Sequence, residues 1–119
     1  MEISFDNNIP IYIQLLEYIK IYLISGTFKC GEKLPSVREF ALTFKVNPNT
    51  MQKALSELEN IGLIYTERTN GKYVTNDQKL ISKLKDEYAL TLAKSYFEGM
   101  KKIVLGKADS IKYLERVEK

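Results

Sequence analysis

The spacing of apolar residues predicts a first helix that begins at Pro10 and ends before Gly26. Proline is well suited to the first helical turn, and glycine commonly follows a helix end. The apolar face of this helix comprises Tyr12, Leu15, Leu16, Ile19 and Leu23. A turn-rich connection follows over residues 27–35, in which Lys33 and Leu34 can form a very short strand.

A second helix is predicted to start at Ser36, because Ser36 and Glu39 have the spacing of a capping box. In this motif the serine oxygen accepts a hydrogen bond from an early backbone amide, and the glutamate accepts one from the amide of the serine. The helix is expected to end near Lys45. Its buried side comprises Val37, Phe40, Ala41 and Phe44.

A third helix begins at Asn47, which can cap it, with Pro48 in the first helical position, and it extends to about Asn60. A rotation of about 100° per residue separates two faces of this helix. The core face comprises Met51, Ala54, Leu55 and Leu58. The opposite face comprises Asn49, Gln52, Lys53 and Ser56, which can all donate hydrogen bonds and are not needed for the core.

After a break at Gly62, two strands are predicted, over residues 63–67 and 72–75. Asn70 and Gly71 join them, because this dipeptide is preferred in tight hairpin turns. The predicted order is helix, helix, helix, hairpin. The expected fold class is therefore mainly α with a small β-hairpin.

From residue 76 onward the pattern indicates a tail of two helices. The first, over residues 76–105, has an apolar residue at every fourth position: Leu80, Leu84, Tyr88, Leu92, Tyr96, Met100 and Val104. At about 1.5 Å per residue this helix is roughly 43 Å long, which exceeds what a domain of this size can cover. We therefore expect it to pack on a second copy of the chain. A final short helix starts at Asp109 and carries Ile111, Leu114 and Val117.

The predicted domains are residues 1–75 and a dimerisation tail, residues 76–119. Gly99 lies within the apolar stripe of the tail. It is either a point where another backbone approaches closely or a tolerated neutral residue. The expected dimer contacts are Leu84, Tyr88, Leu92, Tyr96, Gly99 and Met100.

The composition narrows the function classes. A chain of 119 residues with 45% hydrophobic and 28% charged residues can form one compact domain with an appendage. It has no histidine, the commonest general base, and its single cysteine, Cys30, forms neither an internal disulfide nor a zinc site. The scattered Asp, Glu, Lys and Tyr residues have no motif-like spacing, so we expect no enzyme, no cofactor and no metal. The absence of a signal pattern and of a long apolar run predicts a cytoplasmic protein.

Charge is informative only locally. The net charge is +3, but residues 1–75 carry eight basic and eight acidic side chains. No acid lies between Glu39 and Glu57, and this window contains Lys45 and Lys53, with Arg38 at its border. The window predicts a basic edge.

The polar face of the third helix is a candidate surface for reading DNA. The major groove admits one α-helix and presents donor and acceptor patterns that amide, hydroxyl and ammonium groups can match. Asn49 and Gln52 can read adenine. Lys53 can contact guanine or a phosphate, and Thr50 can hold a phosphate oxygen. An ordinary solvated polar face is the alternative.

Several segments together resemble the GntR family of bacterial regulators. They are PSVREFA (residues 35–41), VNPNT (46–50), ALSELENIGLI (54–64) and NGKYV (70–74). The resemblance covers residues 9–75 almost without gaps, which makes it far more specific than a single short motif. It implies a winged helix-turn-helix that binds operator DNA.

The resemblance also implies roles for individual residues. Ser36 and Arg38 would hold phosphate or reach a base, and Gly71 and Lys72 would form the wing tip near the minor groove. The implied recognition face is Asn47, Asn49, Thr50, Gln52 and Lys53. Many members have arginine at the positions of Pro48 and Gln52, and glycine at the position of Thr69. The operator of arginine-bearing relatives therefore does not transfer to this chain.

The short tail resembles the YtrA-type branch of the family. Only 44 residues follow Thr75, too few for an enclosed metabolite pocket. Members of this branch dimerise through two C-terminal helices and repress operons that encode membrane transporters. The resemblance therefore implies a homodimeric repressor whose partner is operator DNA, with no effector specified. The rival hypothesis is a winged-helix module that binds another protein and no operator.

Overall fold

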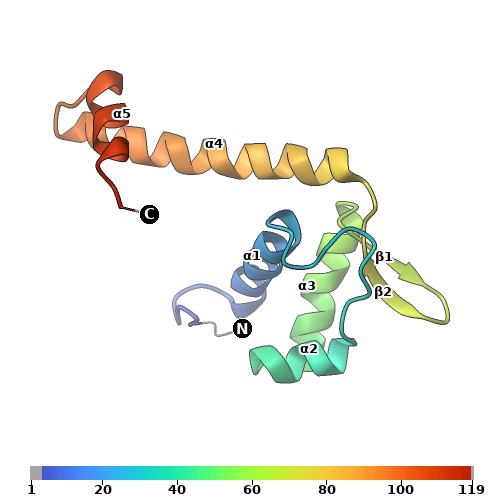
Figure 1. Cartoon of the computed structure of the whole chain (residues 1–119). Coiled ribbons are helices and arrows are strands. Elements are labelled where there is room, and N and C mark those ends of the chain that lie inside the picture. The colour runs from blue at the N-terminus through green and yellow to red at the C-terminus, as the bar shows by residue number, and fades with distance from the viewer. Residues whose placement is uncertain (1–3, 119) are drawn as a thin grey trace. The chain divides into compact units, whose positions relative to one another are not determined.

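The computed structural model describes residues 4–118, which contain five helices and one two-stranded sheet (Figure 1). The predicted domains also include residues 1–3 and 119, which lie outside the described residues. The elements are α1 (Ile11–Ile24), α2 (Val37–Phe44), α3 (Pro48–Asn60), β1 (Ile64–Glu67), β2 (Gly71–Val74), α4 (Gln78–Lys102) and α5 (Lys107–Glu115). The predicted fold class, mainly α with a small hairpin, is confirmed.

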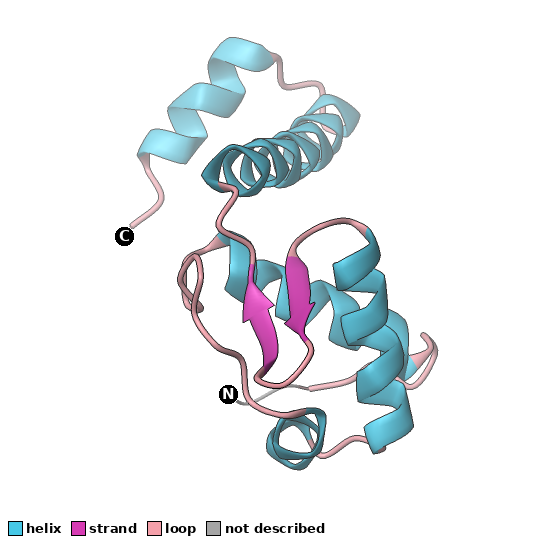
Figure 2. Cartoon of the chain, turned by 90° about the vertical axis from the view of Figure 1, so that its right-hand side faces the viewer, coloured by secondary structure: helices cyan, strands magenta, loops and turns pink. Residues whose placement is uncertain are grey.

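The chain divides into two compact units, one up to Ser82 and one from Lys83. In the first unit α1 packs on α3, α2 packs on α3, and β1 also contacts α3 (Figure 2). Its fully buried side chains come from these elements and from β2, and include Leu15, Ile19, Leu23, Phe40, Met51, Leu55, Leu58, Leu63, Ile64 and Val74. The predicted core faces of the three helices are thus confirmed. Tyr12, Leu16 and Val37 are the exceptions, because each is only half-buried.

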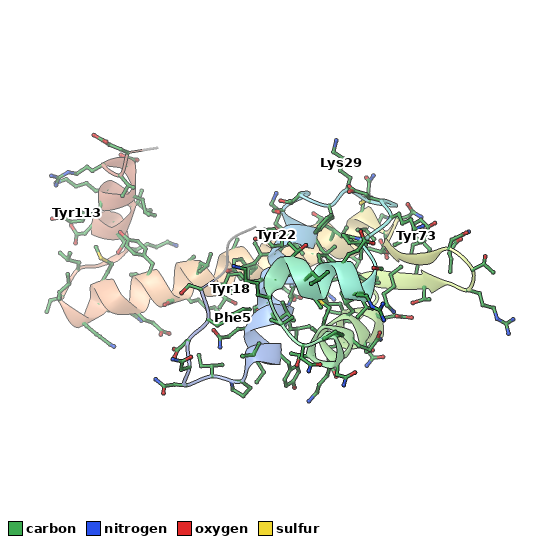
Figure 3. The ribbon with its side chains drawn as sticks, turned by 90° about the horizontal axis from the view of Figure 1, so that it is seen from below. Phe5, Tyr18, Tyr22, Lys29, Tyr73 and Tyr113 are labelled. Carbon is green, nitrogen blue, oxygen red and sulfur yellow. The ribbon has the colours of Figure 1, made fainter. Side chains whose placement is uncertain are left out.

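Aromatic rings connect α1 to α2. Phe28, on the connection between the two helices, makes edge-to-face contacts with Tyr22 and Phe40, at centroid distances of 6.3 and 5.7 Å. Phe5, in the segment that precedes α1, packs edge-on against Tyr18 in the middle of that helix, with 6.1 Å between the ring centroids (Figure 3). These contacts fix the frame that presents α3.

The predicted helix caps form as the sequence indicates. The Ser36 hydroxyl oxygen accepts a hydrogen bond from the Glu39 amide at 3.1 Å, and the Glu39 carboxylate accepts one from the Ser36 amide at 3.2 Å. Lys45 adopts a left-handed conformation with φ of 57° and ends α2. The side-chain oxygen of Asn47 then accepts from the Asn49 amide at 2.7 Å and begins α3. Only a tight turn therefore separates α2 from α3.

The hairpin turn differs from its predicted form. Glu67 pairs with Gly71, so the loop comprises residues 68–70, and Gly71, which was predicted to lie in the turn, is instead the first residue of β2. The Asn70 amide donates to the Glu67 carbonyl oxygen at 3.2 Å, which closes a turn, and Gly71 follows with φ of +106°. The positive φ of glycine is thus used where the second strand begins. The predicted short strand at Lys33 is a single bridge to Tyr73.

The tail helices begin and end at other residues than predicted. The Asp77 carboxylate accepts from the Leu80 amide at 3.1 Å, so α4 starts at Gln78 instead of Asn76. The helix stops at Lys102, because the chain turns left-handed at Val104, with φ of 64°. The last helix, α5, starts before Asp109, whose carboxylate accepts from the Gly106 amide at 3.2 Å. Within residues 4–118 no helix is both long and apolar enough to cross a membrane.

Candidate nucleic-acid interface

The two faces of α3 differ completely in burial. Met51, Ala54, Leu55 and Leu58 have no exposed surface, which confirms the predicted core face. On the other side Asn49, Gln52 and Lys53 are exposed, while Thr50 and Ser56 are half-buried. The Gln52 side-chain amide donates to the Ser56 hydroxyl oxygen at 3.1 Å. The outer face therefore presents amide, hydroxyl and ammonium groups on a helix whose other face is fixed in the core.

The capping residues retain hydrogen-bond donors. The Ser36 oxygen accepts from the Glu39 amide, so its own hydroxyl hydrogen can still be donated. The Asn47 oxygen accepts from the Asn49 amide, which leaves the side-chain NH₂ of Asn47 as a donor. Arg38 is exposed, and the one ion pair in the described part of the chain does not involve it. The start of α2 and the start of α3 thus both carry donors that an anion can accept.

The hairpin tip includes Arg68, a residue that the sequence did not single out. Arg68, Thr69 and Asn70 are exposed in the loop, whereas Gly71 and Lys72 belong to β2. A groove runs between this loop and the start of α2, and its lining includes Ser36, Arg68 and Lys72, as well as Glu39 and Glu67. Assigning the turn to Asn70 and Gly71 put Arg68 just beyond the end of a strand, so its place at the tip was missed. Its positive charge within a predicted hairpin was the available signal.

Lys72 points back toward α3. Its ammonium lies 3.2 Å from the Glu59 carboxylate and donates to the Thr66 hydroxyl oxygen at 3.0 Å. Thr66 in turn donates to Glu59 at 2.9 Å. Thr66 and Lys72 are cross-strand partners, so both side chains lie on one face of the hairpin. The side chain of Lys72 is only 16% exposed, which corrects its predicted place at the wing tip.

This cluster predicts an acid-sensitive hairpin. The hydrogen bond from Thr66 and the ammonium of Lys72 lower the pKa of Glu59 below its ordinary value of 4.5. A lowered folded-state pKa adds stability above the unfolded pKa, and this stability is lost as pH falls through the folded value. At about pH 7 the midpoint temperature of thermal unfolding should therefore be lower for Glu59→Gln than for wild type. The difference between the two midpoints should become smaller as the pH falls to about 3. A constant difference between the two midpoints over this range would contradict the linkage.

The predicted dimer contacts lie on α4 and differ in exposure. Leu84, Tyr88, Tyr96 and Met100 are half-buried, Leu92 is 56% exposed, and Gly99 is exposed. The Tyr96 hydroxyl donates to the Ser110 carbonyl oxygen at 2.8 Å, so Tyr96 fastens α5 to α4 within one chain. A Cβ atom at Gly99 would meet nothing within 4 Å.

An open apolar groove lies between the end of α4 and α5. It is lined by Tyr96, Met100, Ile103, Tyr113, Leu114 and Val117, of which Figure 3 labels Tyr113. Ile103, Leu114 and Val117 are each more than half exposed. The second unit therefore leaves apolar side chains uncovered in the single chain.

Comparison with known sequences identifies a family and close relatives. The family model described as "Bacterial regulatory proteins, gntR family" matches residues 11–74. The uncharacterized HTH-type transcriptional regulator YhcF of Bacillus subtilis (strain 168) is 34% identical over 111 residues, which cover 93% of this chain and 92% of that protein. The HTH-type transcriptional repressor YtrA of the same organism is 42% identical over 79 residues, covering 66% of this chain and 61% of that protein.

Solved structures match the fold. A GntR family transcriptional regulator from Listeria monocytogenes superposes with a TM-score of 0.89 at 40% identity, covering 96% of this chain and all of that one. The DNA-binding domain of AraR in complex with operator ORE1 superposes with a TM-score of 0.54 at 26% identity. That match covers 63% of this chain and 94% of the AraR chain.

Proposed function

This chain belongs to the GntR family and is a DNA-binding transcription regulator, and from this premise we propose that it is a homodimeric repressor of a transporter-type operon. Its relatives carry the names of regulators and repressors, not of enzymes. The observation that carries operator binding, on which the proposal depends, is the outer face of α3, which exposes Asn49, Gln52 and Lys53 above a completely buried core face. The proposal also places the protein in the cytoplasm, as the sequence predicts, because operator DNA lies in the bacterial cytoplasm.

The N-terminal half of α3 is proposed to read base edges in the major groove. Helix-turn-helix proteins contact bases with the first residues of the recognition helix. Asn49 is exposed in the first turn, and Gln52 follows one turn later. Their amides suit the acceptor and donor pair of adenine. Asn47 and Thr50 lie beside them and are assigned to the phosphate backbone.

Phosphate contacts are proposed on both sides of this helix. The hydroxyl of Ser36 and the guanidinium of Arg38 at the start of α2 are available on one side. Arg68 is assigned to the wing tip, with the backbone of Gly71 next to it. Lys72 supports the wing through Glu59 and Thr66, and its positive charge lies in the same groove.

Removing these arginines should weaken binding to every DNA sequence. For Arg38→Ala and for Arg68→Ala, the slope of log affinity against log salt should fall by about one unit, because each phosphate contact releases about one counterion. Lys29→Ala is the matched control, since Lys29 is an exposed cation on the connection between α1 and α2 (Figure 3). Titration of random duplex DNA over a range of salt concentrations measures the slopes. Slopes equal to that of Lys29→Ala would refute the phosphate contacts.

The tail, residues 76–119, is proposed to join two copies. Leu92 is more than half exposed within the stripe, and Leu84, Tyr88 and Met100 are only half-buried. Contiguous apolar patches of this kind on small proteins mark interaction sites. The space around Gly99 is open, so it leaves room for a second backbone there. Two linked winged domains can then bind both halves of a palindrome.

A transporter-type operon is the proposed target, on the basis of the similarity to YtrA. Deleting the gene should raise the transcripts of an operon that encodes a membrane transporter, and the purified protein should bind the promoter of that operon. RNA sequencing and gel-shift titration measure the two effects. If the bound promoters control no transporter genes, this assignment of the target is wrong. If the purified protein binds no promoter, the protein-interaction module becomes the better account.

A further inference from the structure

Lys53 does not extend straight outward from α3. Its ammonium nitrogen lies 3.9 Å from the centroid of the Tyr12 ring, in the first turn of α1. Lys53 is exposed and the Tyr12 side chain is half-buried. Within residues 4–118 the one ion pair joins Lys72 to Glu59, so the ring is the contact that orients Lys53.

This geometry separates Lys53 from the base-reading residues beside it. Lys53 is rotated by about 100° from Gln52 and by about 40° from Asn49, so it lies at the Asn49 edge of the outer face and not at its centre. The cation–π contact draws the ammonium further toward α1. Side chains at the flank of a recognition helix meet the phosphate backbone, which borders the groove, before they meet base edges.

We propose that Tyr12 is a positioning residue that holds the Lys53 ammonium for a DNA phosphate instead of a base. The inference deepens the proposed function and rests on it. An ammonium over a ring keeps its other N–H donors free, so it can bind a phosphate oxygen without leaving the ring. A lysine that reached for a base edge would have to give up this contact. The sequence left guanine and phosphate open for Lys53, and the contact favours phosphate.

Hydrogen bonds of Gln14 fix the start of α1, which carries Tyr12. The Gln14 side chain accepts from the Asp6 amide at 2.7 Å and donates to the carbonyl oxygens of Asp6 and Ile9, both at 2.8 Å. These bonds fasten the preceding segment to the first turn of α1, while α1 packs on α3. The backbone that carries the Tyr12 ring is therefore fixed against α3 in the free protein. Lys53 loses part of its rotamer freedom in the free protein, which reduces the entropy lost on binding.

Four variants test the proposal on a duplex recovered by selection from random DNA and on random duplex itself. Lys53→Ala should weaken binding to both DNAs by the same factor and lower the slope of log affinity against log salt by about one unit. Tyr12→Leu should weaken both by about two- to five-fold, the range expected for an exposed cation–π contact. Tyr12→Phe keeps the ring and should bind like wild type. In the Lys53→Ala background, Tyr12→Leu should have no further effect.

Other results would overturn the inference in identifiable ways. A loss of DNA affinity in Tyr12→Phe would mean that the Tyr12 hydroxyl contributes to binding. A loss of affinity on Tyr12→Leu that persists in the Lys53→Ala background would mean that Tyr12 is merely structural. A loss confined to the selected duplex in Lys53→Ala would make Lys53 a base reader. If Tyr12→Leu does not fold, the proton chemical shifts of the Lys53 ε-methylene in wild type and in Tyr12→Phe test the contact instead. A ring that lies against this methylene moves its signals upfield. Unshifted signals would refute the contact. Wild-type protein without sequence preference would instead refute the proposed function.

Discussion

A Leu92→Glu variant is expected to be monomeric at micromolar concentration and to lose about 10²- to 10⁴-fold in operator affinity. Leu92 is 56% exposed in the single chain, so a carboxylate there costs the isolated protomer little. Between two copies the same carboxylate would be buried without a partner, which is strongly unfavourable. The winged domain should still fold, because its core lies in the first unit. Affinity for a single half-site should therefore remain as in wild type.

Leu90→Glu is the matched control for this prediction. Leu90 is 61% exposed and lies two residues earlier on α4, about 200° around the helix from Leu92. The same substitution off the stripe should leave the dimer and its operator affinity intact. Tyr96 is less suitable for a charge, since its hydroxyl fastens α5 through Ser110. Sedimentation and titration on full and half operators measure both properties, and a monomeric wild type or an undiminished Leu92→Glu affinity would refute the dimer.

Asn49→Ala is expected to lose roughly 1 to 3 kcal/mol on the operator, about 5- to 150-fold in affinity, and to bind random DNA almost as before. Asn49 is exposed in the first turn of α3, and only its backbone amide is used for the cap. Replacing it should therefore leave the fold intact and remove a base contact. Gln52→Ala should show the same selectivity, although Gln52 must first give up its bond to Ser56.

Asn60→Ala provides the matched control on the same helix. Asn60 is exposed near the same side of α3 but at its last residue, about three turns beyond Asn49. Because the early residues of a recognition helix reach bases, removing this amide should change neither operator nor random binding. Equal losses of Asn49→Ala on both kinds of DNA would contradict its assignment as a base reader.

The helices of the first unit follow from local signals in the sequence. The capping box at Ser36 and the cap at Asn47 depend on side chains within three residues, and both form. The core face of α3 follows from its period, since all four predicted positions are fully buried. Such signals are local, so they can be recognised without knowing the fold.

The hairpin and the tail show where local signals fail. The strand register places Gly71 opposite Glu67, and this pairing depends on both strands at once. Lys72 turns inward because Glu59 and Thr66 meet it from α3 and the neighbouring strand. The left-handed turn that follows α4 lies at Val104, and valine ordinarily avoids positive φ.

The candidate site shows the same division. The exposed residues of α3 follow from its period. Arg68 was missed because the loop position depends on strand register, and Tyr12 because its contact with Lys53 joins residues far apart in the chain. Sequence periodicity assigned Tyr12 to the apolar face of its helix, which did not indicate that its ring holds a cation.

Selection of bound sequences from random duplex DNA tests the central claim most directly, because it measures binding, sequence preference and half-site spacing together. A homodimer that reads the major groove with α3 should enrich an inverted repeat whose half-sites are about one helical turn, roughly 34 Å, apart. Recovery of no preferred sequence, or of a single half-site without its repeat, would contradict the claim.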